Sequence, residues 1–127
     1  MKGVVDNGGR SLLSVRLMKS AGSDEASIDV WVDTGFTGDL VLPQSIIDRL
    51  SLEKSESVDA ILADGSQIEL NTFSCEIEWF GRIKPLQIIA NAGDFPLLGV
   101  GLLLGLELRV DYRNLTVNLA PPKRETT

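Results

Sequence analysis

The sequence of 127 residues contains no histidine and a single cysteine, Cys75. Without histidine, neither a Ser-His nor a Cys-His nucleophile pair can form within one chain, and the usual histidine and cysteine ligands of zinc are missing. One cysteine cannot form an intrachain disulfide, so we expect Cys75 to be a small buried hydrophobic residue. We therefore predict no metal and no cofactor, and any hydrolytic chemistry must use carboxylates.

Positive charge and long apolar runs are also scarce. The formal net charge is −6, and Lys123-Arg124 is the basic cluster nearest to a nucleic-acid signal, so nucleic-acid binding is disfavoured. The apolar stretch from Phe95 to Leu106 is about a dozen residues, shorter than the ~20 that a membrane-spanning helix needs. The N-terminus lacks the long apolar segment of a secretory signal. We expect a cytoplasmic protein with no membrane partner.

The composition that remains is that of an ordinary globular domain, with 43% hydrophobic and 24% charged residues. The length fits one domain, which should bury roughly two-thirds of its unfolded surface. We place this domain at residues 1–120 and interpret residues 121–127 as a polar C-terminal tail.

Short apolar segments separated by turn signals predict an all-β barrel or sandwich rather than alternating βα units. We expect four hairpins, which pair residues 12–18 with 28–32, 58–62 with 67–70, 73–79 with 83–90, and 108–110 with 115–119. Asp-Gly is a strong hairpin signal, so the second of these should have a projecting tip at Ala63, Asp64, Gly65 and Ser66. Pro43 at a first helical position, followed by a one-sided apolar pattern, predicts a short helix over residues 43–50.

An acidic residue stands directly after an apolar strand in the run Val32-Asp33-Thr34-Gly35. A carboxylate at a strand end can be held rigidly, Thr34 can donate a hydroxyl hydrogen bond, and Gly35 lets backbone approach closely. The tripeptide Asp-Thr-Gly alone is a weak signal, because an acidic turn that caps a strand would look the same.

The longer run from Val32 to Pro43 resembles the active-site segment of single-domain, bacterial retropepsin-like (clan AA) aspartic proteases. Two further segments follow in the family's order: residues 62–66, where the family carries its flap, and Phe95–Gly99, which resembles the hydrophobic-hydrophobic-Gly motif behind the catalytic loop. Residues 100–103 resemble the family's short helix, and the similarity extends from about Leu12 to Leu119. It implies a small closed barrel of the retropepsin (acid protease) type with one or two short helices and a flap hairpin.

The resemblance also implies a function, that of an aspartic endopeptidase acting on polypeptides. Asp33 would be catalytic, Thr34 and Gly35 would support the active-site loop, and residues 63–66 would cover the substrate. Peptide hydrolysis by this route needs one carboxylate to take a proton from water and one carboxylic acid to protonate the carbonyl oxygen. Since the chain has one Asp-Thr-Gly, a twofold homodimer would have to supply the second acid.

The sequence departs from the family pattern at Val100 and Gly101, where retroviral members usually carry Arg and many bacterial members carry Asp. This leaves the strength of the dimer open. Two alternatives also stay open: a catalytically inactive retropepsin-like dimerisation or peptide-binding domain, and a generic β-barrel binding module with an accidental motif. The hairpin tip alone fits a solvated turn equally well, and we expect Trp31 and Trp79 in the core or at an interface rather than in a site.

Overall fold

Strands dominate the protein. The computed structural model describes residues 1–19, 25–91 and 93–123, and within these ranges the chain forms twelve strands and two short helices. The strands are β1 (Lys2–Val5), β2 (Ser11–Met18), β3 (Glu25–Val32), β4 (Leu40–Pro43), β5 (Glu53–Lys54), β6 (Val58–Ile61), β7 (Gln67–Leu70), β8 (Thr72–Trp79), β9 (Arg82–Asn91), β10 (Leu97–Leu98), β11 (Glu107–Asp111) and β12 (Thr116–Ala120), and the helices are α1 (Gln44–Leu50) and α2 (Val100–Leu103). The predicted all-β class is confirmed.

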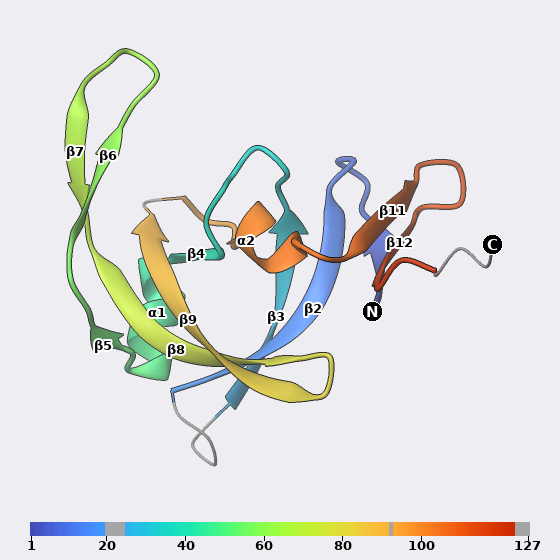
Figure 1. The fold of residues 1–127 in the computed structure, drawn as a ribbon, viewed down its shortest axis with the longest axis horizontal. Helices are drawn as coiled ribbons and strands as arrows, with labels where there is room; N and C mark the ends of the chain where they lie inside the picture. Colours follow the sequence, from blue (N-terminus) through green and yellow to red (C-terminus); the bar gives the residue numbers. More distant parts are fainter. Residues whose placement is uncertain (20–24, 92, 124–127) are drawn as a thin grey trace.

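Six of the strands close into a small barrel (Figure 1). Around the ring, β2 pairs with β3, β3 with β10, β10 with β4, β4 with β9, β9 with β8, and β8 returns to β2. The β3–β10 and β4–β9 pairs are parallel, whereas the other four are antiparallel. Closure removes most free strand edges, and it confirms the predicted small closed barrel.

The barrel interior is filled by the inward-facing residues of each strand. On β2, Leu13, Val15 and Leu17 are buried and alternate with the more exposed Leu12, Ser14 and Arg16, as a strand with one buried face requires. Burial of each such aliphatic side chain stabilises the fold by about 1.5–3 kcal/mol. The two helices add Ile47 and Leu102 to the same core.

The predicted hairpins are all present, although residues 20–24, between the two strands of the first hairpin, and Ala92, after β9, lie outside the described ranges. The helix predicted over residues 43–50 begins one residue later, because Pro43 has an extended ψ of 147° and is the N-cap. The short helix at residues 100–103 is confirmed as α2. Among the described residues, no helix is long and apolar enough to span a membrane.

Three strands extend the sheet beyond the barrel on one side, in the order β11-β12-β1-β2, and β5 pairs with β8 on the other. The sequence analysis did not predict β1, because a short segment flanked by turn residues has little local strand signal. It forms because β12 provides a partner in register, with Gly3 opposite Val117. Gly3 is required by close approach, since a Cβ there would lie 1.9 Å from the backbone oxygen of Leu12.

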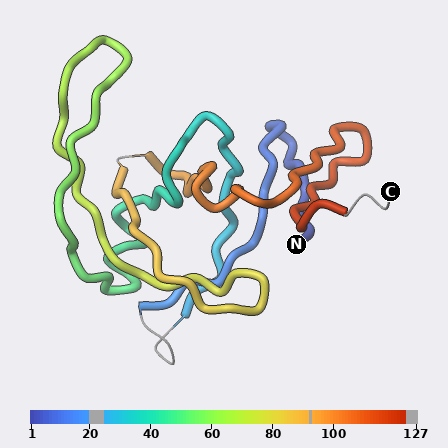
Figure 2. The backbone as a smooth tube through the Cα atoms, in the orientation of Figure 1, coloured from blue at the N-terminus to red at the C-terminus, as the bar shows by residue number. Residues whose placement is uncertain are grey.

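A separate two-stranded sheet, β6–β7, projects from the barrel as a long hairpin (Figures 1 and 2). Its strands pair from Val58 opposite Leu70 to Ile61 opposite Gln67, so β6 ends one residue before the predicted segment 58–62 does. The flap hairpin expected from the sequence is therefore present as a structural element.

Candidate active site

Asp33 lies directly after β3 and is held in place by backbone hydrogen bonds on both sides. Its amide donates to the carbonyl oxygen of Leu98 at 2.8 Å, which continues the parallel pairing of β3 with β10. Its carbonyl oxygen accepts from the amide of Phe36 at 3.2 Å, and its carboxylate Oδ1 accepts from the amide of Gly35 at 2.9 Å. Asp33 is half-buried, so its carboxylate is fixed in direction yet accessible from one side.

The segment from Leu97 to Gly99 packs behind this loop, as the sequence predicts. The amides of Gly99, Val100 and Gly101 donate to the carbonyl oxygens of Asp39, Phe36 and Gly38 at 2.9, 2.7 and 3.0 Å. A Cβ at Gly99 would lie 2.2 Å from the oxygen of Gly38. The loop that carries Asp33 is therefore bonded along most of its length to the chain between β10 and α2.

Asp39 is a residue of this region that the sequence analysis did not single out. A Cβ at Gly101 would lie 2.2 Å from Oδ1 of Asp39, so the carboxylate of Asp39 occupies the space beside residue 101. An acidic group therefore lies next to the first turn of α2 although residue 101 has no side chain. The sequence carried no local signal for this, because the two positions meet only through the packing of the loop on α2.

The other predicted site residues fall in two places. Thr34 is exposed, and its hydroxyl makes no hydrogen bond to any residue that the structure describes. The residues of the hairpin tip are also exposed and stand apart from the Asp33 loop (Figure 1). A single chain thus brings residues 33–35 together but does not bring residues 63–66 to them.

The hairpin tip is a turn whose hydrogen bonds come from its own residues. The amides of Leu62 and Gly65 donate to Ser66 and Leu62 carbonyl oxygens at 2.8 and 2.9 Å, and Gly65 has a left-handed φ of 86°. Oδ1 of Asp64 accepts from the hydroxyl and the amide of Ser66 at 2.6 and 2.9 Å. These two hydrogen bonds hold the pKa of Asp64 below its usual value.

The body of the hairpin has two faces of different chemistry, which follows from its register. Ala60 lies opposite Ile68 and Val58 opposite Leu70, so one face is apolar. On the other face Asp59 lies opposite Glu69. The period-two alternation in residues 58–60 and 67–70 could have predicted this division, although the exposed Ile61 breaks it by lying on the same face as Asp59.

Cys75 and the other possible metal ligands in the described part of the chain do not form a second site of this kind. Cys75 is buried as expected, and burial followed by the charge of Glu76 raises the pKa of its thiol to about 12, so the thiol is protonated at neutral pH. Within the described ranges, no group of three or more histidine, cysteine, aspartate or glutamate side chains could hold a metal ion.

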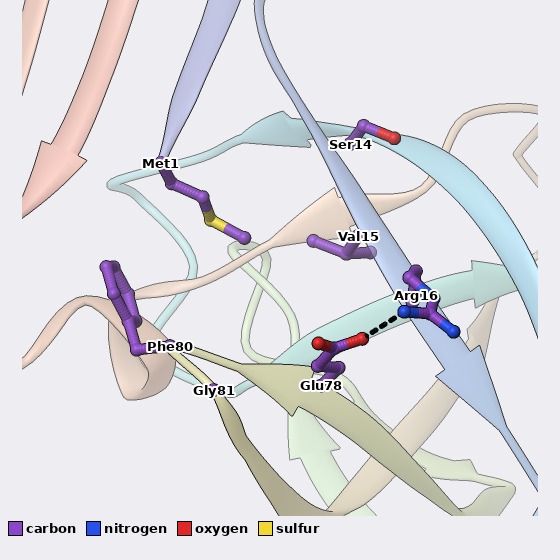
Figure 3. Close-up of a pocket in the computed structure, with 7 residues that line it drawn as sticks. All are labelled: Met1, Ser14, Val15, Arg16, Glu78, Phe80 and Gly81. Atoms are coloured by element: carbon purple, nitrogen blue, oxygen red, sulfur yellow. Dashed lines mark hydrogen bonds and ion pairs between the residues drawn. The ribbon is translucent and has the colours of Figure 1, made fainter.

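A pocket of about 210 Å³ lies between β2 and the β8–β9 turn (Figure 3). Arg16 and Glu78 line this pocket and form an ion pair at 2.6 Å. The half-exposed Phe80 lines it as well. None of the predicted site residues lines this pocket.

No protein-family model matches the sequence, and no curated protein matches it. Solved structures do resemble the fold. A retropepsin-like aspartic protease from Rickettsia conorii superimposes with a TM-score of 0.64 at 18% identity, covering 95% of this chain and 89% of that chain. EIAV protease complexed with the inhibitor HBY-793 gives a TM-score of 0.53 at 18% identity, covering 77% and 88%.

The solution structure of simian foamy virus (mac) protease is similar as well, with a TM-score of 0.51 at 14% identity over 72% of this chain and 90% of that chain. The chain therefore has the retropepsin-like fold. Identities of 14–18% show the fold alone, so activity has to be argued from the site.

Proposed function

We propose that the chain, with residues 1–120 as its protease domain, is one subunit of a homodimeric aspartic endopeptidase that uses Asp33 from both subunits. The observation that carries this proposal is the position of Asp33 on a retropepsin-like barrel: its half-buried carboxylate at a strand end accepts from the amide of Gly35, and its backbone amide donates to the Leu98 carbonyl oxygen. A structural capping role would be met by the bond to Gly35 alone and would not need the second segment packed behind the loop.

The chemistry requires two carboxyl groups that share one proton, as aspartic-protease pairs do at a separation of about 3 Å. One Asp33 carboxylate takes a proton from water, and the oxygen of that water forms a bond to the peptide carbonyl carbon. The protonated Asp33 of the second subunit gives its proton to the carbonyl oxygen. The roles then exchange: the carboxyl group that took the proton from water gives it to the amine nitrogen as the C–N bond breaks. The other carboxylate takes a proton from a hydroxyl of the tetrahedral intermediate, so the product is a carboxylic acid and the pair returns to one shared proton.

Thr34 and the β6–β7 hairpin have supporting roles in this proposal. The exposed hydroxyl of Thr34 is available for a hydrogen bond across the twofold axis, which would fix the two loops relative to each other. The tip residues Ala63, Asp64, Gly65 and Ser66 would cover a bound polypeptide, with main-chain pairing and exclusion of water from the site. The apolar face of the hairpin supports this assignment, because it gives the cover a surface suited to a peptide. The cytoplasmic location remains a prediction.

The test is cleavage of a library of unstructured peptides below neutral pH by the wild type and by the Asp33→Asn variant. The variant keeps the shape of the side chain but cannot supply the carboxylate, so we expect a loss of at least about a hundredfold, the lower scale of general acid–base catalysis. Asp29→Asn is the matched control, since Asp29 is an exposed aspartate on β3, the strand that ends just before Asp33. It should keep wild-type activity.

Thermal unfolding and sedimentation must show that fold and dimer are the same in all three proteins. Full activity of the Asp33→Asn variant would contradict the assignment. A wild type that stays monomeric at high concentration would contradict it too. A dimer that binds peptides without cleaving them, equally in wild type and variant, would instead identify the inactive peptide-binding domain.

A further inference from the structure

One cation and two aromatic rings gather beside the strand that leads to Asp33. The guanidinium of Arg10 lies 4.0 Å from the ring centre of Phe95 and 5.9 Å from that of Trp31. The two rings meet edge to face, with their centres 6.4 Å apart. A cation over aromatic faces at these distances is an attractive contact, and the edge-to-face pair adds to it.

Arg10 is held in this position by its own turn. Its Nε pairs with Oδ2 of Asp6 at 2.7 Å, and its amide donates to Oδ1 of Asp6 at 2.9 Å. The amide of Gly8 donates to the same Oδ1 at 3.0 Å, and the amide of Asp6 donates to the Arg10 carbonyl oxygen at 3.0 Å. These hydrogen bonds fix the conformation of the β1–β2 turn. The guanidinium of Arg10 is therefore held by Asp6 while it packs on the two rings.

The hydrogen bonds of Arg10 also keep Asp6 charged. Its backbone amide first, and then its side chain, hold the pKa of Asp6 below its usual value. The contact between Asp6 and Arg10 is therefore an ion pair at any pH near neutral.

The two rings belong to the two segments that seat Asp33. Trp31 is on β3, two residues before Asp33, and its amide donates to the carbonyl oxygen of Pro96 at 2.9 Å. Phe95 immediately precedes Pro96. The next bond along this parallel pair is the one from the Asp33 amide to the Leu98 carbonyl oxygen.

The pairing of β3 with β10 involves only two residues of each strand, Trp31 with Leu97 and Val32 with Leu98. A ladder this short has few backbone hydrogen bonds. Side-chain contacts at its end therefore contribute a large part of the free energy that holds the two strands together. The rings of Trp31 and Phe95 lie at that end.

We infer that Arg10, anchored by Asp6 and packed on Trp31 and Phe95, is a positioning residue that clamps the β3–β10 ladder and thereby fixes the backbone of Asp33. The consequence for catalysis rests on the proposed protease function, whereas the consequence for the backbone does not.

The test compares amide hydrogen exchange in the wild type, Arg10→Ala and Arg10→Lys. In Arg10→Ala, exchange at the Trp31 and Asp33 amides should become about two- to fivefold faster, the change expected for loss of one exposed cation–aromatic contact. Arg10→Lys should recover part of this protection, because lysine keeps the charge but not the planar stacking of arginine. The Val117 amide, on β12, reports any general loss of stability.

Arg109→Ala is the matched control. Arg109 is ion-paired like Arg10, with Glu107 at 2.6 Å, but it is exposed and lies on β11 in the terminal sheet. It should leave the Trp31 and Asp33 amides unchanged. Equal exchange at these two amides in the Arg10 and Arg109 variants would overturn the inference, and so would an acceleration that is the same at Val117.

Kinetics give the second readout. In Arg10→Ala we expect kcat to fall by about three- to tenfold with KM within about twofold, because a displaced catalytic group slows chemistry without weakening substrate binding. A raised KM at unchanged kcat would mean that Arg10 contacts the substrate, which contradicts a positioning role. If the wild type cleaves nothing, the proposed function fails, but the exchange experiment still decides whether the clamp exists.

Discussion

Gly99 shows at the scale of one residue how tightly the active-site loop is packed. Its backbone has φ −100° and ψ 178°, an extended conformation that any residue can adopt. The requirement for glycine is therefore one of space. A Cβ there would lie 2.2 Å from the Gly38 oxygen and 2.7 Å from the Phe36 oxygen, both backbone atoms that cannot rotate away.

Replacing Gly99 with alanine should lower the free energy of unfolding by about 1–3 kcal/mol, the usual cost of forcing extra volume into a packed site. Urea unfolding of the two proteins measures the difference. Gly8→Ala is the control, because a Cβ at Gly8 would meet nothing closer than 3.5 Å, an ordinary contact with Asp6. A Gly99→Ala protein as stable as Gly8→Ala would show that the loop is free to move away from α2.

At the scale of elements, the β6–β7 hairpin carries an unfavourable charge arrangement. Asp59 lies directly opposite Glu69, and like charges in this relation destabilise a strand pair. The hairpin is not hydrogen-bonded into the main sheet, and a two-stranded sheet alone is marginally stable. The Asp59–Glu69 pair therefore destabilises the β6–β7 hairpin, which has no hydrogen bonds to the main sheet to compensate.

Changing Asp59 to lysine, or Glu69 to lysine, should stabilise the hairpin by about 0.2–1 kcal/mol, because each creates an opposite-charge pair. Exchange of the hydrogen-bonded hairpin amides should slow by about 1.4- to fivefold in either single variant. The double variant is the control: it restores like charges and should return to wild-type exchange. A gain that persists in the double variant would trace the effect to β-propensity or net charge and not to the pair.

The elements that the sequence predicted correctly are those with strong local signals. The alternation of residues 73–79, the Asp-Gly turn at residues 64 and 65, and the one-sided pattern of α1 each needs only its neighbours to be interpreted. Strand β1 and the two-residue β10 were not predicted, because their strand conformation comes from partners distant in sequence. Propensity is a weak guide where pairing is non-local.

The same division applies to the candidate site. Asp33, Thr34 and Gly35 form a contiguous motif, so the sequence alone located them. Asp39 beside Gly101 and Arg10 over Phe95 are contacts between segments that only the folded chain brings together. The ring pair and the guanidinium come from three separate parts of the sequence, and no spacing rule connects them.

At the scale of the whole molecule, the proposed chemistry depends on an assembly of two chains. Each chain has a formal net charge of −6, so two chains repel each other over a Debye length of about 10 Å at 0.1 M salt. Contacts at the twofold axis must offset that repulsion. Dilution and low salt should therefore be the conditions that separate the subunits first.

Mixing wild-type and Asp33→Asn chains tests whether two Asp33 carboxylates act together. After subunit exchange at equal proportions, random pairing leaves about one quarter of the dimers with two aspartates. If hydrolysis needs both, activity should fall to about one quarter of that of the same total amount of wild type, and it should follow the square of the wild-type fraction. The measurement is a titration of variant into wild type at constant total protein, with initial rates read after equilibration.

The shape of that titration separates the possible mechanisms. Asp29→Asn chains, which keep Asp33, serve as the control and should leave activity constant at every ratio. A linear decline to one half would mean that each Asp33 works alone, and it would contradict a shared proton between subunits. The quadratic curve requires both dimerisation and a joint role for the two carboxylates, because neither property alone makes activity depend on the square of the wild-type fraction.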